Sequence, residues 1–268
     1  MSLLKERLDV VLTEKGLFQS RERAKAAIMA GIVYVDGERI DKAGTAVSLE
    51  AEFSIKEDLC PYVSRGGLKL EKALREFSID LNDAVCMDIG ASTGGFTDCM
   101  LQNGAKTVYA VDVGYGQLDW KLRNDNRVVN MEKVNIRYLD TTELKEKIDF
   151  ISIDVSFISL KLVFPVASAL LKETGKLICL VKPQFEAGRN QVGKKGIVKD
   201  KNIHKEVIAN VIEYAKTNGL YPQELDFSPV TGTKGNIEYL VLLNKSDNST
   251  DFSFDTIVNA AHAEFLLR

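Results

Sequence analysis

The sequence is poor in the residues that metal sites and hydrolase triads require. Histidine occurs only twice, as His204 and His262. A zinc site of several histidines or a Ser-His-Asp hydrolase therefore has little material, and we expect no metal site. The four cysteines are Cys60, Cys86, Cys99 and Cys179. They show no C-x-x-C spacing, so we expect free thiols in a reducing cytoplasm.

Long apolar runs and an excess of basic charge are also absent. The nearest candidate for a membrane span, residues 150–171, contains Asp154, Lys161 and Pro165. Each charge at the centre of a bilayer would cost roughly 2.5–3.5 kcal/mol. The charged first eleven residues are unlike a signal peptide, so we expect a cytoplasmic protein that does not bind membranes. With 35 Lys and Arg against 38 Asp and Glu, the net charge of −3 argues against a general nucleic-acid coat protein.

The composition is that of a globular protein. Hydrophobic residues make up 45% and charged residues 27% of the 268 positions, which excludes disorder, collagen and coiled coil. The length allows one large domain or two modest ones. The break at Cys60-Pro61 predicts two: a first domain over 1–59, a linker over 60–63 and a second domain over 64–268.

The first domain shows signals of two short helices followed by strands. Apolar residues recur at helical spacing over 7–15 and 20–30, with Ser20 as a plausible N-cap and Gly31 as the helix end. Residues 32–35 then predict a strand that enters a tight turn, and residues 47–55 supply a further short strand or two. The sequence therefore predicts a small α+β domain.

These helices carry a recognisable pattern. Its elements are Arg7-Leu8-Asp9, Ser20-Arg21, Ala24, Ile28 and the stretch from Gly31 to Gly37. The pattern resembles the S4 RNA-binding domain, and that resemblance implies that the paired helices present basic side chains to structured RNA. The candidate RNA contacts are Arg7, Lys15, Arg21, Arg23 and Lys25. Residues 1–31 have a local net charge of only +2, so a solvated helix face of mixed charge is the alternative.

The rest of the chain alternates between strand and helix signals. Strand-like apolar runs occur at 85–89, 107–111, 128–131, 150–153, 177–181 and 239–243. Helical patterns separate most of them, a helix is expected over 67–77 before the first, and another over 252–267 closes the chain. This alternation predicts a doubly wound α/β sheet.

The glycine-rich stretch Asp88-Ile-Gly-Ala-Ser-Thr-Gly-Gly-Phe96 follows the first of these strands. Glycines there let the backbone approach a ligand at the carboxyl edge of a sheet. The spacing G-x-x-x-G-G fits neither the dinucleotide fingerprint nor a P-loop. Asp88 would repel a pyrophosphate but could hold an ammonium group. A structural turn without a ligand is the alternative.

A second acid, Asp112, follows the next strand, where a ribose-binding carboxylate belongs. An ordinary strand-end acid is the alternative. Together with the glycine loop it resembles the S-adenosylmethionine loop of Rossmann-like class I methyltransferases, which implies that cofactor. The candidate cofactor-binding residues are Asp88, Gly90, Ser92, Thr93, Gly94, Gly95, Phe96, Asp112, Val113, Asp154 and Phe157. Phe157 and Tyr115 could pack against the adenine or the methionine chain, or equally in the core.

Four charged residues fall at helix and strand ends in the order Lys69, Asp154, Lys182, Glu238. This order resembles the tetrad of FtsJ-like ribose 2′-O-methyltransferases. The surrounding sequence resembles the TlyA family in five segments: Val63–Gly67, Asp88–Phe96, Asp112–Leu118, Ser156–Leu160 and Val181–Glu186. That resemblance implies a cytoplasmic enzyme that methylates cytidine 2′-hydroxyls of ribosomal RNA, alone or in a ribosomal subunit, despite a historical haemolysin label.

The implied chemistry needs a base and alignment, because a ribose hydroxyl is a poor nucleophile while a sulfonium methyl group is already electrophilic. Lys182 could take or direct the hydroxyl proton if its pKa, about 10.4 when unperturbed, is lowered by desolvation and by a neighbouring cation such as Lys69. Asp154 and Glu238 would orient the two lysines. Each residue alone has an ordinary interpretation, since a strand-end lysine is more often solvated than catalytic.

Residues 182–205 carry seven basic residues and two acidic ones, a local net charge of +5. Three glycines make the stretch loop-like, and we expect a flexible basic lip that contacts RNA phosphates, with a solvated loop as the alternative. Arg189, Lys194 and Lys195 are its candidate contacts, and Arg65, outside this stretch, is a further candidate RNA contact. The chain departs from some TlyA relatives in two places: residues 59–62 lack an Arg and a Trp, and residues 231–234 lack a serine.

Two rival functions remain at this point. The haemolysin label suggests a membrane-lytic protein, although the sequence shows no apolar segment of membrane length. A non-catalytic RNA-binding or ribosome-assembly factor could also retain the cofactor fold. The set of acids and lysines favours an enzyme over both.

Overall fold

The computed structural model describes residues 5–18, 20–55, 60–140, 142, 144, 146–248 and 250–266. The chain forms two compact units, Met1–Pro61 and Tyr62–Arg268. The expected end of the first domain, Leu59, lies outside the described residues.

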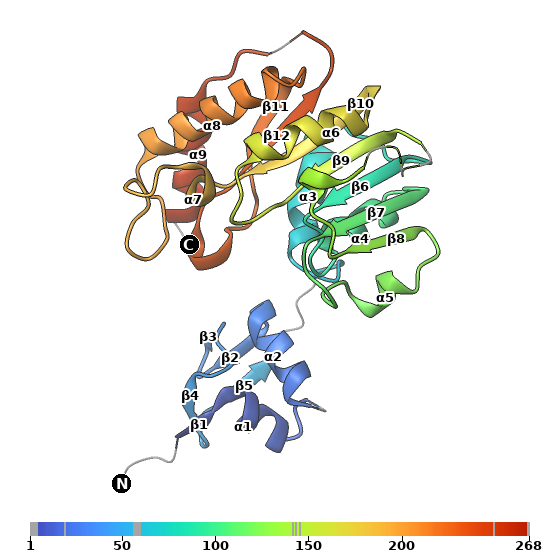
Figure 1. Cartoon of the computed structure of the whole chain (residues 1–268). Helices are drawn as coiled ribbons and strands as arrows, with labels where there is room; N and C mark the ends of the chain where they lie inside the picture. The colour runs from blue at the N-terminus through green and yellow to red at the C-terminus, as the bar shows by residue number, and fades with distance from the viewer. Residues whose placement is uncertain are drawn as a thin grey trace. The chain divides into compact units, whose positions relative to one another are not determined.

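The first unit is built from two helices and short strands (Figure 1). The elements are β1 (Lys5–Arg7), α1 (Leu8–Glu14), α2 (Arg21–Ala30), β2 (Val33–Val35), β3 (Glu38–Arg39), β4 (Ala46–Ser48) and β5 (Phe53–Ile55). Strands β3, β2 and β5 form one antiparallel sheet, and β1 pairs with β4. Apolar side chains of α1, α2, β2 and β4 form a shared buried core. The predicted α+β domain with two helices is confirmed.

The ends of α2 follow the local signals in the sequence. The Ser20 hydroxyl accepts a hydrogen bond from the Arg23 backbone N–H at 3.3 Å, and Gly31 ends the helix in the left-handed region at φ +77°. Asp36 and Gly37 both have positive φ, as a tight turn between β2 and β3 requires. Strand β1 was not predicted, because its three charged residues have no apolar alternation.

The second unit is a seven-stranded sheet with helices on both faces. Its strands are β6 (Val85–Ile89), β7 (Thr107–Asp112), β8 (Val128–Glu132), β9 (Ile148–Ile153), β10 (Leu171–Val181), β11 (Tyr221–Phe227) and β12 (Tyr239–Asn244). Their order is β11-β12-β10-β9-β6-β7-β8, with β12 antiparallel to both of its neighbours and the pairs from β10 to β8 parallel.

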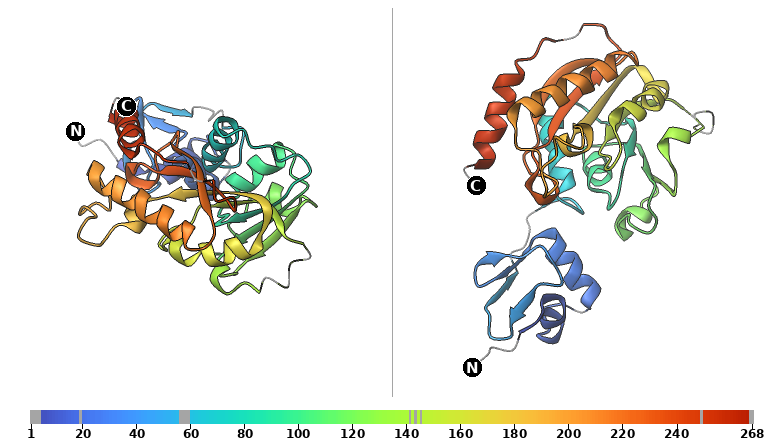
Figure 2. Two further views of the ribbon diagram at one scale, coloured as in Figure 1. Left: turned by 90° about the horizontal axis from the view of Figure 1, so that it is seen from above. Right: turned by 60° about the vertical axis from the view of Figure 1, so that its left-hand side comes forward.

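Alternate side chains of the strands face two separate cores, as in Met87 on one face and Cys86 on the other. The helices involved are α3 (Gly66–Glu76), α4 (Gly95–Gln102), α6 (Phe164–Leu170), α8 (Lys201–Lys216) and α9 (Phe254–Leu266). Helices α3 and α4 cover the face of Cys86, and α6, α8 and α9 cover the face of Met87 (Figure 2). The doubly wound α/β class is confirmed. Among the described residues, no helix is long and apolar enough to cross a membrane.

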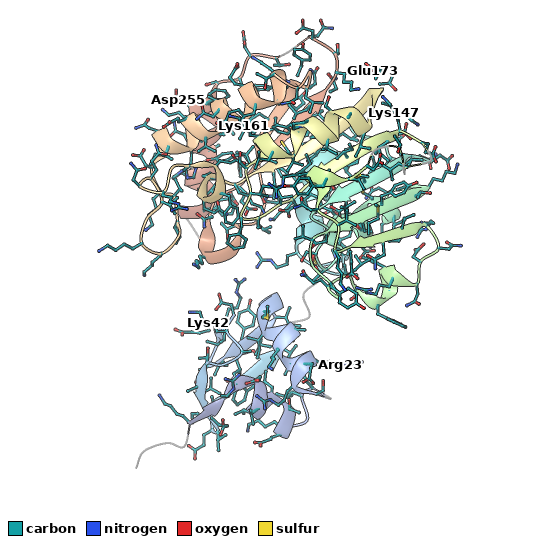
Figure 3. The ribbon with its side chains drawn as sticks, viewed as in Figure 1. Arg23, Lys42, Lys147, Lys161, Glu173 and Asp255 are labelled. Atoms are coloured by element: carbon teal, nitrogen blue, oxygen red, sulfur yellow. The ribbon has the colours of Figure 1, made fainter. Side chains whose placement is uncertain are left out.

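The expectation of a basic loop over 182–205 is wrong at both ends. Residues Pro183–Glu186 form α7, and α8 begins after Asp200, whose side chain caps it by accepting from the Asn202 N–H at 2.8 Å. On α8, Lys205 forms an ion pair at 2.8 Å with Asp255 of α9, which Figure 3 labels. The helix cap thus turns part of the expected lip into a helix–helix contact, and the loop is confined to residues 187–200.

The sheet brings the predicted site residues to one edge. Strands β6, β9 and β10 are parallel neighbours, so the residues after their carboxyl ends lie together. Strand β12 runs the other way, and its first residue, Tyr239, pairs with Val181 at the end of β10. Glu238 therefore reaches the same edge as Asp154 and Lys182.

Candidate active site

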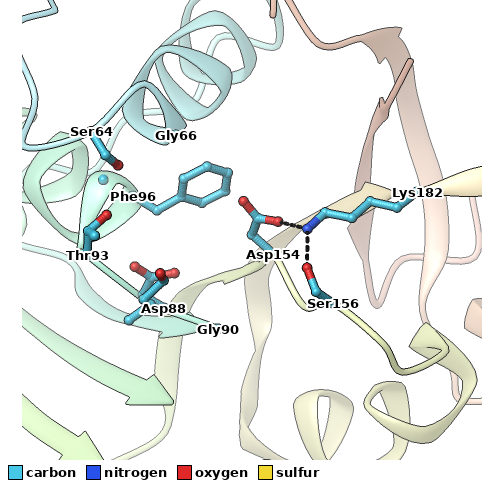
Figure 4. Close-up of a pocket in the computed structure, with 12 residues that line it drawn as sticks. Ser64, Gly66, Asp88, Gly90, Thr93, Phe96, Asp154, Ser156 and Lys182 are labelled. Carbon is cyan, nitrogen blue, oxygen red and sulfur yellow. Dashed lines mark hydrogen bonds and ion pairs between the residues drawn. The ribbon is translucent and has the colours of Figure 1, made fainter. Parts of the chain in front are cut away.

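A cavity of about 200 Å³ lies at this carboxyl edge (Figure 4). Its lining includes eight of the residues predicted to bind cofactor or act in the reaction: Asp88, Gly90, Ser92, Thr93, Gly95, Phe96, Asp154 and Lys182. It also includes Ser64, Gly66, Ala91 and Ser156, which were not predicted as site residues. Gly94, Asp112, Val113 and Phe157 lie outside the lining.

The glycines of the loop are required by the protein's own atoms. Gly90 has φ +90°, and a Cβ there would lie 2.5 Å from the Asp154 carbonyl oxygen. Gly94 has φ +95°, and a Cβ there would collide with the side chain of Leu122. Both positions combine positive φ with a close approach, so the spacing serves the packing of the loop as well as a ligand.

Asp88 is fully buried and bound by its neighbours. One carboxylate oxygen accepts from the Thr97 N–H at 2.9 Å and the Thr97 hydroxyl at 2.7 Å, and the other accepts from the Ser152 hydroxyl at 3.0 Å. Burial raises the pKa of Asp88 to about 6, although these hydrogen bonds favour the charged form. The side chain therefore fixes the start of α4 to β6 and β9 besides facing the cavity.

Asp88→Asn is expected to remove a pH dependence of stability. The pKa of Asp88 is about 6 in the folded chain against an ordinary 3.8, so the folded state holds the proton more tightly and its stabilisation declines as the pH rises through 6. Relative to the Asn variant, the wild type should lose about 1–1.5 kcal/mol between pH 5 and pH 8. Urea unfolding of both proteins at the two pH values measures this, and an unchanged difference would contradict it.

Asp112 joins the glycine loop to the segment after β7. Its carboxylate accepts from the Ser92 N–H at 2.8 Å and from the Gly114 N–H at 2.7 Å. A carboxylate has about four acceptor positions, so two remain for a ligand such as a ribose diol. The residue is thus more than an exposed strand-end acid.

The four charged residues form a chain of alternating sign. Glu238 lies 2.6 Å from the Lys69 ammonium, which lies 3.8 Å from Asp154 Oδ2. The other oxygen of Asp154 lies 2.5 Å from Lys182 Nζ, and this nitrogen also donates to the Ser156 hydroxyl at 3.1 Å (Figure 4). All four side chains are at most 18% exposed. The structure thus brings together residues from α3 and from three strand ends.

Neighbouring charges control the pKa values in this chain. Burial would lower the pKa of Lys69, but the attraction of Asp154 and Glu238 outweighs it and the pKa is raised. Burial would likewise raise the pKa of Asp154, but the two lysines hold it below its usual value. Asp154 bridges the two ammonium groups, whereas the sequence suggested that Lys69 acts directly on Lys182.

The core alternative for the two loop aromatics is wrong. Phe157 is 91% and Tyr115 72% exposed. The ring of Phe157 lies against that of Phe185, with centroids 4.9 Å apart, and Lys133 Nζ lies 4.2 Å from the Tyr115 ring centre. Both follow strand ends at the carboxyl edge, where side chains point away from the buried faces.

Two of the predicted RNA contacts in the first unit share one acid. Arg7 and Arg21 lie 3.0 and 2.9 Å from the carboxylate of Asp9, which is fully buried, and both arginines remain half exposed. These ion pairs hold the pKa of Asp9 at about 2, mainly through the Arg7 hydrogen bond. The remaining candidates are Lys15, Arg23 (Figure 3), Lys25, Arg65, Arg189, Lys194 and Lys195, of which Lys25 and Arg65 are partly buried and the others exposed.

Comparisons with known proteins agree with this geometry. The FtsJ-like methyltransferase family matches residues 62–245, and the S4 domain family matches residues 6–53. The chain is 54% identical over 245 residues to "Putative rRNA methyltransferase YqxC" of Bacillus subtilis, covering 91% of this chain and 87% of the relative. It is 41% identical over 238 residues to "16S/23S rRNA (cytidine-2′-O)-methyltransferase TlyA" of Mycobacterium tuberculosis, covering 88% and 89%. The solved structure "Putative hemolysin from Streptococcus thermophilus" is 49% identical with a TM-score of 0.79, covering 99% of this chain and 98% of that one.

Proposed function

Because the chain belongs to the FtsJ-like methyltransferase family and carries an S4 domain at its N-terminus, we propose that it transfers a methyl group from S-adenosylmethionine to a ribose 2′-hydroxyl of ribosomal RNA. The name of the TlyA relative gives cytidine as the methylated nucleotide, and we propose the same nucleotide for this chain. The observation that carries the proposal is the alternating chain of Lys69, Asp154, Lys182 and Glu238 beside the cavity of the glycine loop.

The residues around the cavity suit a cationic, ribose-bearing cofactor. The lining combines glycine backbone with the carboxylates of Asp88 and Asp154 and the hydroxyl groups of Ser92 and Thr93. Carboxylates favour an ammonium or sulfonium group over a phosphate. Asp112, with two free acceptor positions, would take the ribose hydroxyls. When bound, the cofactor supplies the electrophilic methyl group.

The four charged residues would prepare the substrate hydroxyl. Lys182 lies at the cavity wall, fixed by Asp154 and Ser156, and would either orient the 2′-oxygen as the ammonium or take its proton as the neutral amine. Lys69, itself paired with Glu238, would hold Asp154 from the far side. The transfer would form an oxygen–carbon bond and break the carbon–sulfur bond of the cofactor, with the electron pair left on sulfur. The hydroxyl proton would pass to Lys182 where it is the neutral amine, or to solvent where Lys182 is the ammonium.

Methyl incorporation tests the function directly. Ribosomal subunits from cells that lack this activity are incubated with the protein and S-adenosylmethionine labelled in the methyl group, and the modified nucleotide is mapped. We expect one methyl group per subunit, on a cytidine 2′-oxygen. Absence of label with retained subunit binding would contradict the proposal and support a non-catalytic assembly factor. Absence of label with leakage of liposomes exposed to the pure protein would contradict it and support a lytic protein.

The double variant Arg7→Ala, Arg21→Ala should bind ribosomal RNA more weakly. Each arginine offers one phosphate contact from the half-exposed pair on Asp9. Affinity for RNA falls as salt rises, and removing either arginine should make the slope of log affinity against log salt less steep by about 1. Filter binding between 50 and 200 mM salt would measure this. Arg75→Ala, which removes an exposed arginine of α3, is the control. An unchanged slope in the double variant would exclude the pair as phosphate contacts.

A further inference from the structure

Besides the Asp154–Lys182 ion pair, the loop after β9 and the segment that begins at Lys182 are joined at three places. Lys182 donates to the Ser156 hydroxyl at 3.1 Å. The rings of Phe157 and Phe185 lie 4.9 Å apart. Glu186 accepts two hydrogen bonds from the end of the same loop. The proposed reaction uses only the first contact, so the third needs an explanation of its own.

Glu186 binds the loop with both carboxylate oxygens. Oε2 accepts from the Ser159 hydroxyl at 2.7 Å, and Oε1 accepts from the Leu160 N–H at 2.8 Å. The residue is partly buried, and burial raises the pKa of the carboxyl group against the effect of the two hydrogen bonds. A partly buried carboxylate that gives both oxygens to one loop fixes the position of that loop.

The position of this contact bears on the reacting pair. The parallel pairing of β9 and β10 runs as far as Ile153 and Cys179. Asp154 and Lys182 lie just beyond it, at the starts of the two segments whose later residues Glu186 joins. The pair is therefore held between the sheet on one side and the Glu186 contact on the other.

The backbone between these two supports is strained. Phe157 has φ +65°, a conformation that a bulky side chain rarely adopts, and its side chain is 91% exposed. Such a conformation persists only where flanking contacts determine it. Ser159 and Leu160, two and three residues later, are the residues that Glu186 holds.

We propose that Glu186 is a positioning residue for methyl transfer, which keeps the loop bearing Asp154 and Ser156 in place against Lys182. The inference rests on the proposed function of Lys182. Glu186 does not line the cavity, so it acts through the residues that do.

The test compares Glu186→Ala with Glu186→Gln. The alanine variant loses both acceptors, and a displacement of the reacting pair by about 1 Å should lower kcat by about 10- to 100-fold. Glutamine keeps an acceptor for the Leu160 N–H and should stay within about threefold of the wild type. The Kd of S-adenosylmethionine, measured by calorimetry, should stay within about threefold of the wild type in both, because Asp88 and the glycine loop keep their places. A general loss of structure would weaken cofactor binding far more.

Two further variants isolate the contact. Ser159→Ala removes one of the two hydrogen bonds, together with the acceptor for the Lys161 N–H at 3.2 Å, so its loss of kcat should be smaller, and the two losses should be less than additive in the Glu186→Ala background. Glu173→Ala, which removes an exposed acid at the other end of β10, should leave kcat unchanged. An active wild type with full kcat in Glu186→Ala would overturn the proposal.

A second readout does not depend on activity. Hydrogen exchange at the Leu160 amide should be faster in Glu186→Ala than in the wild type and remain close to wild type in Glu186→Gln. If the wild type transfers no methyl group, the proposed function has failed, and unchanged exchange at Leu160 would also overturn the positioning role. Faster exchange would support the positional role of Glu186 by itself.

Discussion

Lys182→Met is expected to lower methyl transfer by about 10³-fold or more while leaving cofactor affinity within about threefold. Methionine nearly matches the lysine side chain in length but cannot hydrogen-bond to a ribose oxygen or exchange a proton with it. General acid–base groups contribute about 10²- to 10⁴-fold, and Lys182 would also orient the oxygen. Asp154 keeps Lys69 as a partner at 3.8 Å, so the fold should persist. Single-turnover incorporation of labelled methyl groups measures the rate, and calorimetry measures the affinity.

A matched control lies within β10, the strand that precedes Lys182. Lys176 is in the middle of this strand and pairs with Asn244, the last residue of β12, away from the carboxyl edge, so Lys176→Met should retain full turnover. Circular dichroism melts of both variants separate a loss of chemistry from a loss of structure. Turnover above a tenth of the wild-type rate in a folded Lys182→Met protein would exclude Lys182 as base or positioner, whatever the fate of the methyl-transfer function.

The predictable part of the fold is the part that local chemistry specifies. Strand β6 was predicted with its observed bounds because an apolar run, interrupted only by Asp88, ends at a glycine loop. Strand β11 was not predicted, because its sequence, YPQELDF, has polar residues among the apolar ones and contains Pro222. An edge strand of this kind is stabilised by β12 beside it rather than by its own composition. Tertiary pairing therefore decides such elements.

The site was predictable where residues follow strand ends, and less so where contacts join distant segments. Asp154 and Lys182 follow parallel strands, so their meeting could be expected from the pattern. Ser156 and Glu186 belong to motifs shared with the TlyA family, but sequence spacing does not show that they contact Lys182 and the β9 loop. Nor does spacing show that Asp154 bridges both lysines. The contacts of Ser156 and Glu186 join residues 26 to 27 positions apart in the chain, and such contacts depend on side-chain geometry.

Gly90→Ala is expected to damage stability, cofactor binding and turnover together. A Cβ at Gly90 would lie 2.5 Å from the carbonyl oxygen and 2.9 Å from the carbonyl carbon of Asp154. Both are backbone atoms. The Asp154 N–H donates to the Ile89 carbonyl at 2.9 Å, so the Gly90 backbone and the Asp154 backbone cannot move apart without breaking this hydrogen bond at the edge of the sheet. We expect a loss of about 3 kcal/mol from left-handed strain and overpacking combined.

The Cβ added by Gly90→Ala would push the Asp154 backbone away and so move the Asp154 carboxylate away from Lys182. Turnover should therefore fall by about 10²-fold or more. Gly219→Ala separates the two contributions, because Gly219 also has positive φ, +69°, but has no atom within 4 Å of the added Cβ. This control should lose only about 1–2 kcal/mol and retain full turnover. Urea unfolding measures the loss of stability in both variants, and methyl incorporation measures the loss of turnover. Equal losses at Gly90 and Gly219 would mean that Gly90 serves backbone conformation alone. Larger losses at Gly90 would mean that this glycine keeps the glycine loop and the Asp154 carboxylate at their required distance.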